Sequence, residues 1–470
     1  MKKRGPVPTT EYSHKYYGAT YLLDSVSQKI GLTHDLKLCF PGSYKQILSL
    51  AFYLLLEPDN TLYRFEKWNH THWHPYGKNI SSTRSSDIFS NITDAQRTQF
   101  FQLQGRRRTK EEYLAYDTTS ISSYSEALHQ VQYGKNKEDD RLPQLNLALV
   151  FGEESNLPFY YRKLPGNVPD TKTLLTLLED FESLGFDKAK FVMDRGFYSE
   201  ANINSLYKER VKFLMSAKTS TTFIKKHIDS AADSLVCFEN YIPHYEIYGT
   251  TITAEWDYTQ ERPRKGDKLK EKRRIYVHVY YDKKRAVEEE VKLDAHLSRL
   301  KYELENEERQ ASNSKDYLKY FEIKSTPKRG AKVTLKSEVV ALERKYAGYF
   351  VLVSNEKKNT AAVLELYRNK DAVEKAFGNL KDKLGMRRLL VSSELSLEGK
   401  IFVQFISLIL HSYLKKQMAL KNIYSRYSFQ EAMDKLDVIE CFLRPGKSLA
   451  VGEVLKAQSQ SFTDFGITSL

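Results

Sequence analysis

The sequence contains little cysteine and lacks a long apolar run. Its 470 residues include three cysteines, Cys39, Cys237 and Cys441, with no Cys-x-x-Cys pair, which argues against a disulfide framework or a zinc ribbon. The longest apolar runs, residues 47–56 and 401–414, fall short of the roughly 20 residues that span a bilayer and predict buried core helices. The charged N-terminus runs into a Gly-Pro-Val-Pro segment rather than an apolar one, so we expect no secretory signal and a reducing, cytoplasmic location.

Positive charge, in contrast, is in surplus. The chain has 73 Lys and Arg against 60 Asp and Glu, a formal net charge of +13. Such a surplus on a folded protein favours polyanions, either nucleic acid or an anionic membrane surface. A membrane-surface protein would need a strongly basic amphipathic helix, which we do not find. The sequence also has no Walker loop or Gly-x-Gly-x-x-Gly fingerprint, so no nucleotide cofactor is expected.

The middle of the chain has the pattern of an α/β fold. Segments 113–119, 145–151 and 159–163 predict an antiparallel strand meander. A helix over 171–184, capped by Asp170 and ended by Gly185, a strand over 190–194, a helix over 200–210 and a strand over 212–216 follow. This order predicts a ribonuclease H-like core. Its next element should be a helix, but we expect Thr- and Tyr-rich strands instead.

We expect five segments along the chain. They are a helical N-terminal DNA-binding domain (1–105), the first part of the core (106–217), a mainly-β insertion (218–354), the second part of the core (355–415) and a helical C-terminal region (416–470). The insertion holds predicted strands at 244–253, 274–281, 332–336 and 349–354 and a charged helix at 286–308. The second part of the core begins with a predicted long helix over 360–384.

Two carboxylates, Asp117 and Asp194, each end a predicted strand. A carboxylate in that place can hold Mg²⁺ that keeps several waters and binds phosphate. With a third acid, such residues could bind two metals about 4 Å apart, one activating water and the other stabilising the leaving oxygen. A lone Asp at a strand end is, however, more often a turn former.

The predicted helix 360–384 offers Glu374 as the third acid. Tyr367, Lys370, Glu374 and Lys381 fall within an arc of roughly 60° at about 100° per residue. The apolar face that can pack on the sheet consists of Val373, Ala376, Phe377, Leu380 and Leu384. By spacing alone, a solvated charged face is the commoner explanation of such a row.

The spacing Tyr367-x2-Lys370-x3-Glu374-x6-Lys381 resembles the Tyr-x2-Arg-x3-Glu-x6-Lys signature of DDE transposases encoded by bacterial insertion sequences, the cut-and-paste class with a β-strand insertion before the catalytic Glu. Met-Asp194-Arg-Gly-Phe is similar to that family's second-Asp motif, and Ala-Tyr-Asp117-Thr-Thr to its first. The signature's Arg is Lys370 here, so a bidentate phosphate contact would become a point-charge contact.

The resemblance implies that Asp117, Asp194 and Glu374 bind two Mg²⁺ (or Mn²⁺) ions. It also implies that Tyr367, Lys370 and Lys381 contact the ends of the transposon. The partners that it implies are double-stranded DNA, as terminal inverted repeats and as target, and a second copy of the chain in a synaptic homodimer. The reaction that it implies is cleavage followed by strand transfer, in a bacterial or archaeal cytoplasm.

Further DNA contacts are expected from residues outside the signature. They are Arg195 beside the second Asp, Arg106, Arg107 and Arg108 in one basic run, and Arg273 and Arg274 at the end of the dense basic stretch 262–274. For the run 106–110, a solvated charged turn is about equally plausible. Trp256 could stack on a base flipped out of the duplex, with ordinary hairpin packing as the commoner alternative.

Two alternatives to a transposase stay open. One is a ribonuclease H-like nuclease that cuts DNA without joining strands. The other is a catalytically silent DNA-binding derivative of a transposase, against which the intact set of three acids argues.

Overall fold

The computed structural model describes residues 13–57, 61–107, 112–123, 128–134, 142–186, 189–261, 266–326, 330–382, 384, 393–444 and 446–470. The chain divides into two compact units. Unit 1 comprises residues 1–192 and 369–470, and unit 2 comprises residues 193–368. The five predicted segments remain a prediction, and their boundaries differ from those of the two units.

Unit 1 begins with a helical region, as predicted. Its helices are α1 (Gly18–Lys29), α2 (Leu32–Cys39), α3 (Tyr44–Leu56), α4 (Phe65–Thr71), α5 (Ser82–Ser90) and α6 (Asp94–Arg106). The apolar run of α3 is buried throughout, so the prediction of a core helix there is confirmed. A capping box starts α6, since the Thr93 hydroxyl accepts from the Gln96 amide and the Gln96 side chain accepts from the Thr93 amide.

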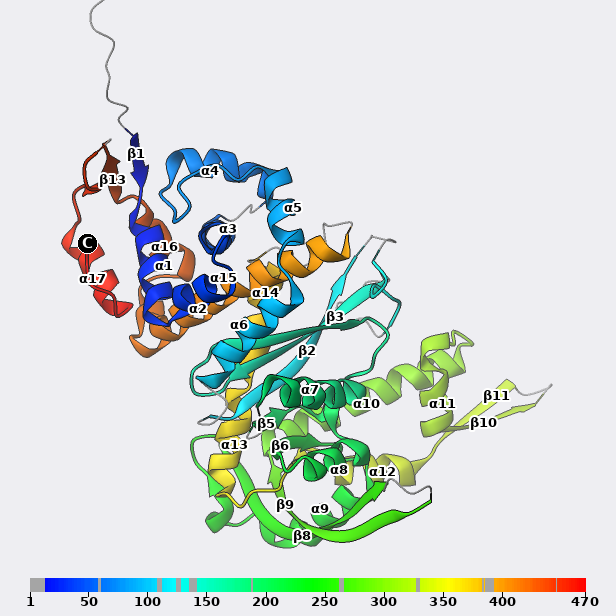
Figure 1. Ribbon diagram of the computed structural model, residues 1–470. Helices are drawn as coiled ribbons and strands as arrows, with labels where there is room; N and C mark the ends of the chain where they lie inside the picture. Colours follow the sequence, from blue (N-terminus) through cyan, green and yellow to red (C-terminus); the bar gives the residue numbers. More distant parts are fainter. Residues whose placement is uncertain are drawn as a thin grey trace, which may run out of the picture. The chain divides into compact units, whose positions relative to one another are not determined.

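The second predicted core helix is α15 (Glu394–Leu420). It is long and apolar enough to cross a membrane, but 78% of its most apolar window is buried inside the protein. It packs against α3 and α5 (Figure 1), and a Cβ at Gly399 would lie 2.2 Å from the Phe89 carbonyl oxygen. Glycine at this position therefore permits the close approach of α15 to α5.

The C-terminal part of unit 1 contains helices and a small sheet. The helices are α16 (Phe429–Asp437) and α17 (Lys456–Asp464). β13 (Glu440–Leu443) pairs antiparallel with both β1 (Ser13–Tyr16) and β14 (Ala450–Val451). The first described strand of the chain is thus held by one of its last. Residues 416–470 thus contain helices together with strands that the sequence does not predict.

The predicted antiparallel strand meander is confirmed in unit 1. β2 (Leu114–Ser122), β3 (Gln144–Gly152) and β4 (Pro158–Pro165) pair antiparallel in the order β4-β3-β2, and β5 (Lys190–Met193) lies beside β2. α7 (Asp170–Leu184) ends at Gly185, which has φ 76°, as the left-handed C-terminal position prefers. β2 runs five residues beyond Asp117, so the prediction that Asp117 ends a strand was wrong. The residues that follow, Thr118 to Ser122, continue the ladder with β3.

The predicted single helix 360–384 is also wrong. The chain forms α13 (Thr360–Asn369) and α14 (Asp371–Asp382), with a turn at Lys370. Asn369 and Asp371 flank this turn, and the short side chains of Asn and Asp favour helix ends over helix interiors. The predicted apolar face of α14 is confirmed. Its residues Val373, Ala376, Phe377, Leu380 and the following Leu384 are all buried, and α14 packs on β2, β3 and α15.

Unit 2 contains an antiparallel sheet in the order β6-β12-β9-β8-β7. Its strands are β6 (Lys212–Ala217), β7 (Tyr241–Ile242), β8 (Ile247–Glu261), β9 (Lys268–Tyr281) and β12 (Tyr349–Ser354). Two helices, α8 (Glu200–Lys208) and α9 (Thr222–Leu235), pack on β8. The expectation that no helix would follow β6 was therefore wrong. The apolar spacing of Ile224, Ile228, Ala231 and Leu235 indicates the α9 helix.

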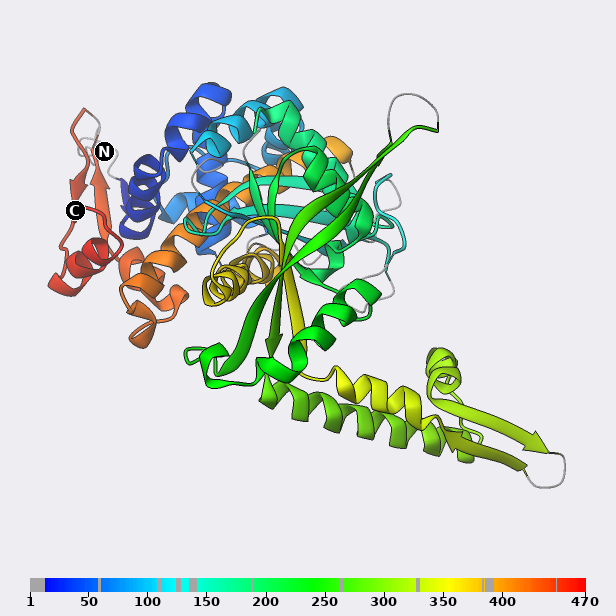
Figure 2. The ribbon, with the colours of Figure 1, turned by 90° about the horizontal axis from the view of Figure 1, so that it is seen from below.

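The remainder of unit 2, residues 283–345, is named the arm here. It consists of α10 (Lys283–Glu305), α11 (Ser314–Tyr320), β10 (Phe321–Thr326), β11 (Gly330–Leu335) and α12 (Ser337–Lys345). Figure 2 shows α10, α12 and the β10–β11 hairpin extending away from the strands of unit 2. Because segment 218–354 holds α9, α10, α11 and α12 as well as strands, the prediction of a mainly-β insertion was wrong, and the segment is mixed α/β. Short 3-10 helices occur at Leu62–Arg64, Arg195–Phe197, Phe238–Asn240, Ala311–Asn313 and Ile423–Ser425.

Candidate active site

Asp117 lies in the middle of β2, where it pairs with Leu149 of β3. Its Oδ1 accepts a hydrogen bond of 2.7 Å from the backbone amide of Thr118, which orients the carboxylate. The Thr118 hydroxyl donates to Oδ1 of Asp170, at 2.5 Å. Since neighbouring side chains of a strand point to opposite faces, Asp117 faces away from the side on which α7 lies. The prediction that Asp170 caps α7 was wrong, because Pro169 occupies the capping position and Asp170 is the first helical residue.

Glu374 lies in the first turn of α14, the helix that packs on β2. Its side chain is 57% exposed, and its carboxylate accepts a 2.8 Å hydrogen bond from Nζ of Lys370, whose own side chain is buried. A buried ammonium is costly without a charged partner, and Glu374 supplies one. The start of a helix also stabilises a carboxylate through the helix dipole. The arrangement leaves the Glu374 carboxylate oriented by Lys370 and open to solvent.

Asp194 and Tyr367 are brought together within unit 2. Asp194 directly follows β5 and precedes the 3-10 helix Arg195–Phe197. The Tyr367 hydroxyl, from α13, donates to Oδ1 of Asp194 at 2.7 Å. The resemblance implied a DNA contact for Tyr367. In the structure this phenol positions the second proposed metal-binding acid, a relationship that nothing in the sequence spacing indicated. Arg195 is exposed beside it.

The other signature cation, Lys381, lies in the last turn of α14 and is buried. Asp117 and Glu374 belong to unit 1, and Asp194 belongs to unit 2. Neither unit groups three His, Cys, Asp or Glu side chains into a metal site among its described residues. The donor set fits magnesium by its chemistry, since carboxylate oxygens are the ligands that Mg²⁺ prefers.

The first basic run is partly structural. Arg106, the last residue of α6, is exposed. Arg107 instead binds Oδ1 of Asp35 at 2.7 Å, and Gln104 binds Oδ2 of the same carboxylate at 2.6 Å. Asp35 is fully buried, so Arg107 neutralises a charge that would otherwise destabilise the helical region. Arg108 lies outside the described residues.

The basic stretch in the insertion forms part of the β8–β9 ribbon, of which residues 262–265 lie outside the described structure. On one face of this ribbon, Lys268, Lys272 and Arg274 stand opposite Glu261, Asp257 and Glu255. Lys272 forms an ion pair with Asp257, and Lys268 lies 3.6 Å from Glu261. On the other face, Arg273 stacks 4.7 Å over the Tyr258 ring and binds Glu271 at 2.6 Å. Among the described residues of this stretch, Lys268, Lys272 and Arg274 thus face acids of β8, whereas Arg273 binds an acid of its own strand.

Trp256 is packed inside unit 2. It is 8% exposed, its indole Nε1 donates to Oδ1 of Asn204 at 2.9 Å, and its ring meets Phe223 edge to face at 5.2 Å. This geometry is the ordinary packing that the sequence offered as the alternative to base stacking. In this conformation the Trp256 ring is covered, so stacking on a base would require it to leave Asn204.

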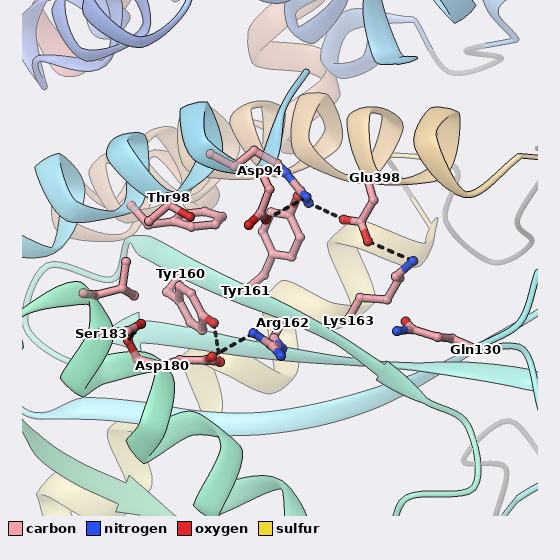
Figure 3. Close-up of a pocket in the computed structure, with 13 residues that line it drawn as sticks. Asp94, Thr98, Gln130, Tyr160, Tyr161, Arg162, Lys163, Asp180, Ser183 and Glu398 are labelled. Carbon is pink, nitrogen blue, oxygen red and sulfur yellow. Dashed lines mark hydrogen bonds and ion pairs between the residues drawn. The ribbon is translucent and has the colours of Figure 1, made fainter. Parts of the chain in front are cut away.

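A polar cleft of about 360 Å³ lies between β4, α6 and α7 in unit 1 (Figure 3). Sequence reasoning missed its residues, because they are scattered along the chain. Lys163 binds Glu394 and Glu398 at 2.6 and 2.8 Å, Arg97 also binds Glu398, and Arg162 binds Asp180 at 2.7 Å. Burial raises the pKa of Glu398, but Arg97 and Lys163 outweigh it and lower that pKa overall. These ion pairs join β4 to α7 and α15, and α6 to α15.

The family model of the transposase DDE domain matches residues 108–410. The chain belongs to this transposase family. The match includes Asp117, Asp194 and Glu374, and membership gives the chain a transposase function. No curated protein matches the chain. A solved structure, the cryo-EM structure of the piggyBac transposase synaptic complex with hairpin DNA, is similar with 10% identity and a TM-score of 0.37, over 88% of this chain and 70% of that one.

Proposed function

We propose that this transposase cleaves the ends of an insertion sequence and joins the freed 3′-hydroxyl to target DNA. Asp117, Asp194 and Glu374 hold two Mg²⁺ or Mn²⁺ ions in this proposal. The observation that carries it is the family match, which spans all three acids in an order and spacing that resemble the Tyr-Arg-Glu-Lys signature. A ribonuclease H-like core interrupted by residues 218–354 is part of the same proposal.

Hydrogen bonds from other residues of the chain orient the three carboxylates. Tyr367 donates to one oxygen of Asp194, the Thr118 amide donates to one oxygen of Asp117, and Lys370 donates to one oxygen of Glu374. Each acid thereby has one oxygen held in place by a donor of the chain. Such outer partners fix ligand orientation and tune metal affinity. When bound, two metal ions would activate the attacking hydroxyl and neutralise charge on the leaving oxygen.

The proposed substrate is double-stranded DNA, first as terminal inverted repeats and then as target. Exposed Arg195 and Arg106 are available for phosphates, and Lys370 and Lys381 flank Glu374 along the chain. We propose that catalysis occurs in a synaptic homodimer in a bacterial or archaeal cytoplasm. Phosphate contacts release counterions, so affinity for the element's ends should fall steeply with salt.

The test substitutes each acid in turn, as Asp117→Asn, Asp194→Asn and Glu374→Gln, and measures cleavage of an inverted-repeat oligonucleotide with Mg²⁺. Glu66→Gln, an exposed acid of α4, is the matched control. We expect cleavage to fall at least a hundredfold in each site variant and to stay unchanged in the control. Full cleavage by any one site variant would overturn the assignment of that acid.

A second assay separates this function from its alternatives. A pre-cut 3′ end is supplied together with a target plasmid, and joined product is measured. A transposase gives joined product, whereas a nuclease without strand transfer gives cleavage alone. A silent derivative would bind the same DNA and give neither product.

A further inference from the structure

The arm of unit 2 has a hydrophobic core of its own. Its buried residues, contributed by α10, α11, β10 and α12, are Leu297, Leu300, Leu304, Tyr317, Tyr320, Phe321 and Val340. Ion pairs fasten the helices around this core, between Arg344 and Asp294 at 2.5 Å and between Lys319 and Glu343 at 2.6 Å. The β10–β11 hairpin is therefore held by a packed base and is preorganised to present a surface.

The hairpin has two different faces. Phe321, Ile323 and Val333 point toward the arm's core and pack there. Because strand side chains alternate, Lys324 and Lys332 lie on the opposite face, where both are exposed. The hairpin thus turns an apolar side to its own base and a cationic side to solvent.

Lys324 and Lys332 stand directly opposite each other in the antiparallel register. Side chains in such a pair have Cβ atoms about 5 Å apart, and like charges in this position destabilise a hairpin. Glu322 approaches Lys324 at 3.7 Å, and Lys332 has no ion-pair partner among the described residues. The β8–β9 ribbon differs in this respect, because Lys272 there faces Asp257 and Lys268 faces Glu261.

This contrast within one unit points to an external anion at the hairpin. Positive charge also predominates in the surrounding sequence, since residues 319–336 contain six Lys and Arg and one acid, Glu322. Two cationic groups side by side match the repeated phosphates of a nucleic acid backbone. A two-stranded ribbon is also of a size that a DNA groove admits.

We propose that the outer face of the β10–β11 hairpin, through Lys324 and Lys332, binds the phosphate backbone of double-stranded DNA. The inference rests on the proposed function for the identity of the polyanion. It adds a DNA contact remote in sequence from the three acids and from the signature cations. The contact is independent of DNA sequence, because phosphates carry no base information.

The test uses the full chain, and binding of random-sequence double-stranded DNA is measured without metal at several salt concentrations. Lys324→Ala/Lys332→Ala should weaken binding roughly tenfold at moderate salt and reduce the slope of log Kd against log salt by about 2. Lys292→Glu, a charge reversal at an exposed lysine of α10 in the same arm, is compared with Lys332→Glu.

Lys332→Glu tests the proposal even if the double alanine variant alters folding. It replaces the like-charge pair with an opposite-charge pair, so the melting temperature should be unchanged or higher while DNA binding weakens more than in Lys292→Glu. Wild-type affinity and salt slope in both hairpin variants would overturn the proposal, as would equal weakening by Lys292→Glu. Binding is measured without metal, so this test does not depend on cleavage. The two proposals can therefore fail independently of each other.

Discussion

The Tyr367 hydroxyl donates a 2.7 Å hydrogen bond to the carboxylate of Asp194. A phenol of the signature thus acts on a proposed metal ligand, whereas the family resemblance implies a contact with DNA. The two roles predict different effects of a mutation, because a partner of a metal ligand affects metal affinity and a phosphate contact affects DNA affinity. They can be separated by removing the hydroxyl alone.

Tyr367→Phe should raise the Mg²⁺ concentration needed for half-maximal cleavage by about tenfold, since partners of metal ligands are typically worth 10–100-fold in affinity or activity. Binding of inverted-repeat DNA without metal should be unchanged. Magnesium titration of cleavage and a gel-shift assay measure the two effects. Tyr63→Phe, at an exposed tyrosine, is the control. A loss of metal-free DNA binding with an unchanged Mg²⁺ requirement would instead favour the DNA contact.

Lys370 offers a second test of positioning. Lys370→Met keeps an unbranched apolar stem in the buried space and removes the ammonium that binds Glu374. Because Glu374 is largely exposed and can be solvated without its partner, we expect the melting temperature to change by only a few degrees. Cleavage should fall at least tenfold. Lys370→Arg, which restores the residue of the signature, should retain cleavage, and equal activity of Lys370→Met and wild type would contradict the positioning role.

Local patterns predicted much of the fold. The strands β2, β3, β4 and β12 and the helix α7 were predicted close to their observed bounds, because apolar periodicity and turn residues indicate such elements directly. The break at Lys370 was missed although Asn369 and Asp371 favour helix ends. The apolar spacing runs through the whole segment and indicates one continuous helix, whereas the local preferences of those two residues decide where the helix breaks.

The site was harder to predict than the fold for a physical reason. The spacing of Tyr367, Lys370 and Glu374 suggests candidate residues, but hydrogen bonds between distant segments decide which groups each one contacts. Tyr367 and Asp194 are separated by 173 positions. In the same way, the acids that face Lys268, Lys272 and Arg274 of β9 lie on β8, and only the register of the two strands reveals this pairing.

A Trp256 variant can distinguish a packing role of this residue from a role in DNA cleavage. Trp256→Phe keeps an aromatic ring against Phe223 but removes the donor to Asn204, so it should lower the free energy of unfolding by about 1 kcal/mol. If packing is its whole role, cleavage of inverted-repeat DNA at a temperature well below melting should match wild type. Phe223→Leu, which disturbs the same contact from the other side, is the comparison. A large loss of cleavage in Trp256→Phe alone would instead show that the indole has a role beyond packing.

His278 makes the stability of the protein depend on pH. It is fully buried in β9, bonded to the hydroxyls of Thr251 and Ser354, and burial lowers its pKa to about 4. An unfolded histidine has a pKa near 6.5. As the pH falls below 6.5, the histidine therefore binds a proton in the unfolded chain but not in the folded chain. The free energy of unfolding decreases as a result until about pH 4.

At pH 5 this effect should cost roughly 2 kcal/mol relative to pH 7, from the difference in proton binding. His278→Asn can keep hydrogen bonds to Thr251 and Ser354 without titrating. Urea unfolding at pH 7 and pH 5 should then show a drop in free energy that is smaller by about 2 kcal/mol than in wild type. His70→Asn, at an exposed histidine of α4, should behave like wild type. Equal drops in His278→Asn and wild type would show that His278 is protonated in the folded protein, and that the interior of unit 2 accommodates its charge.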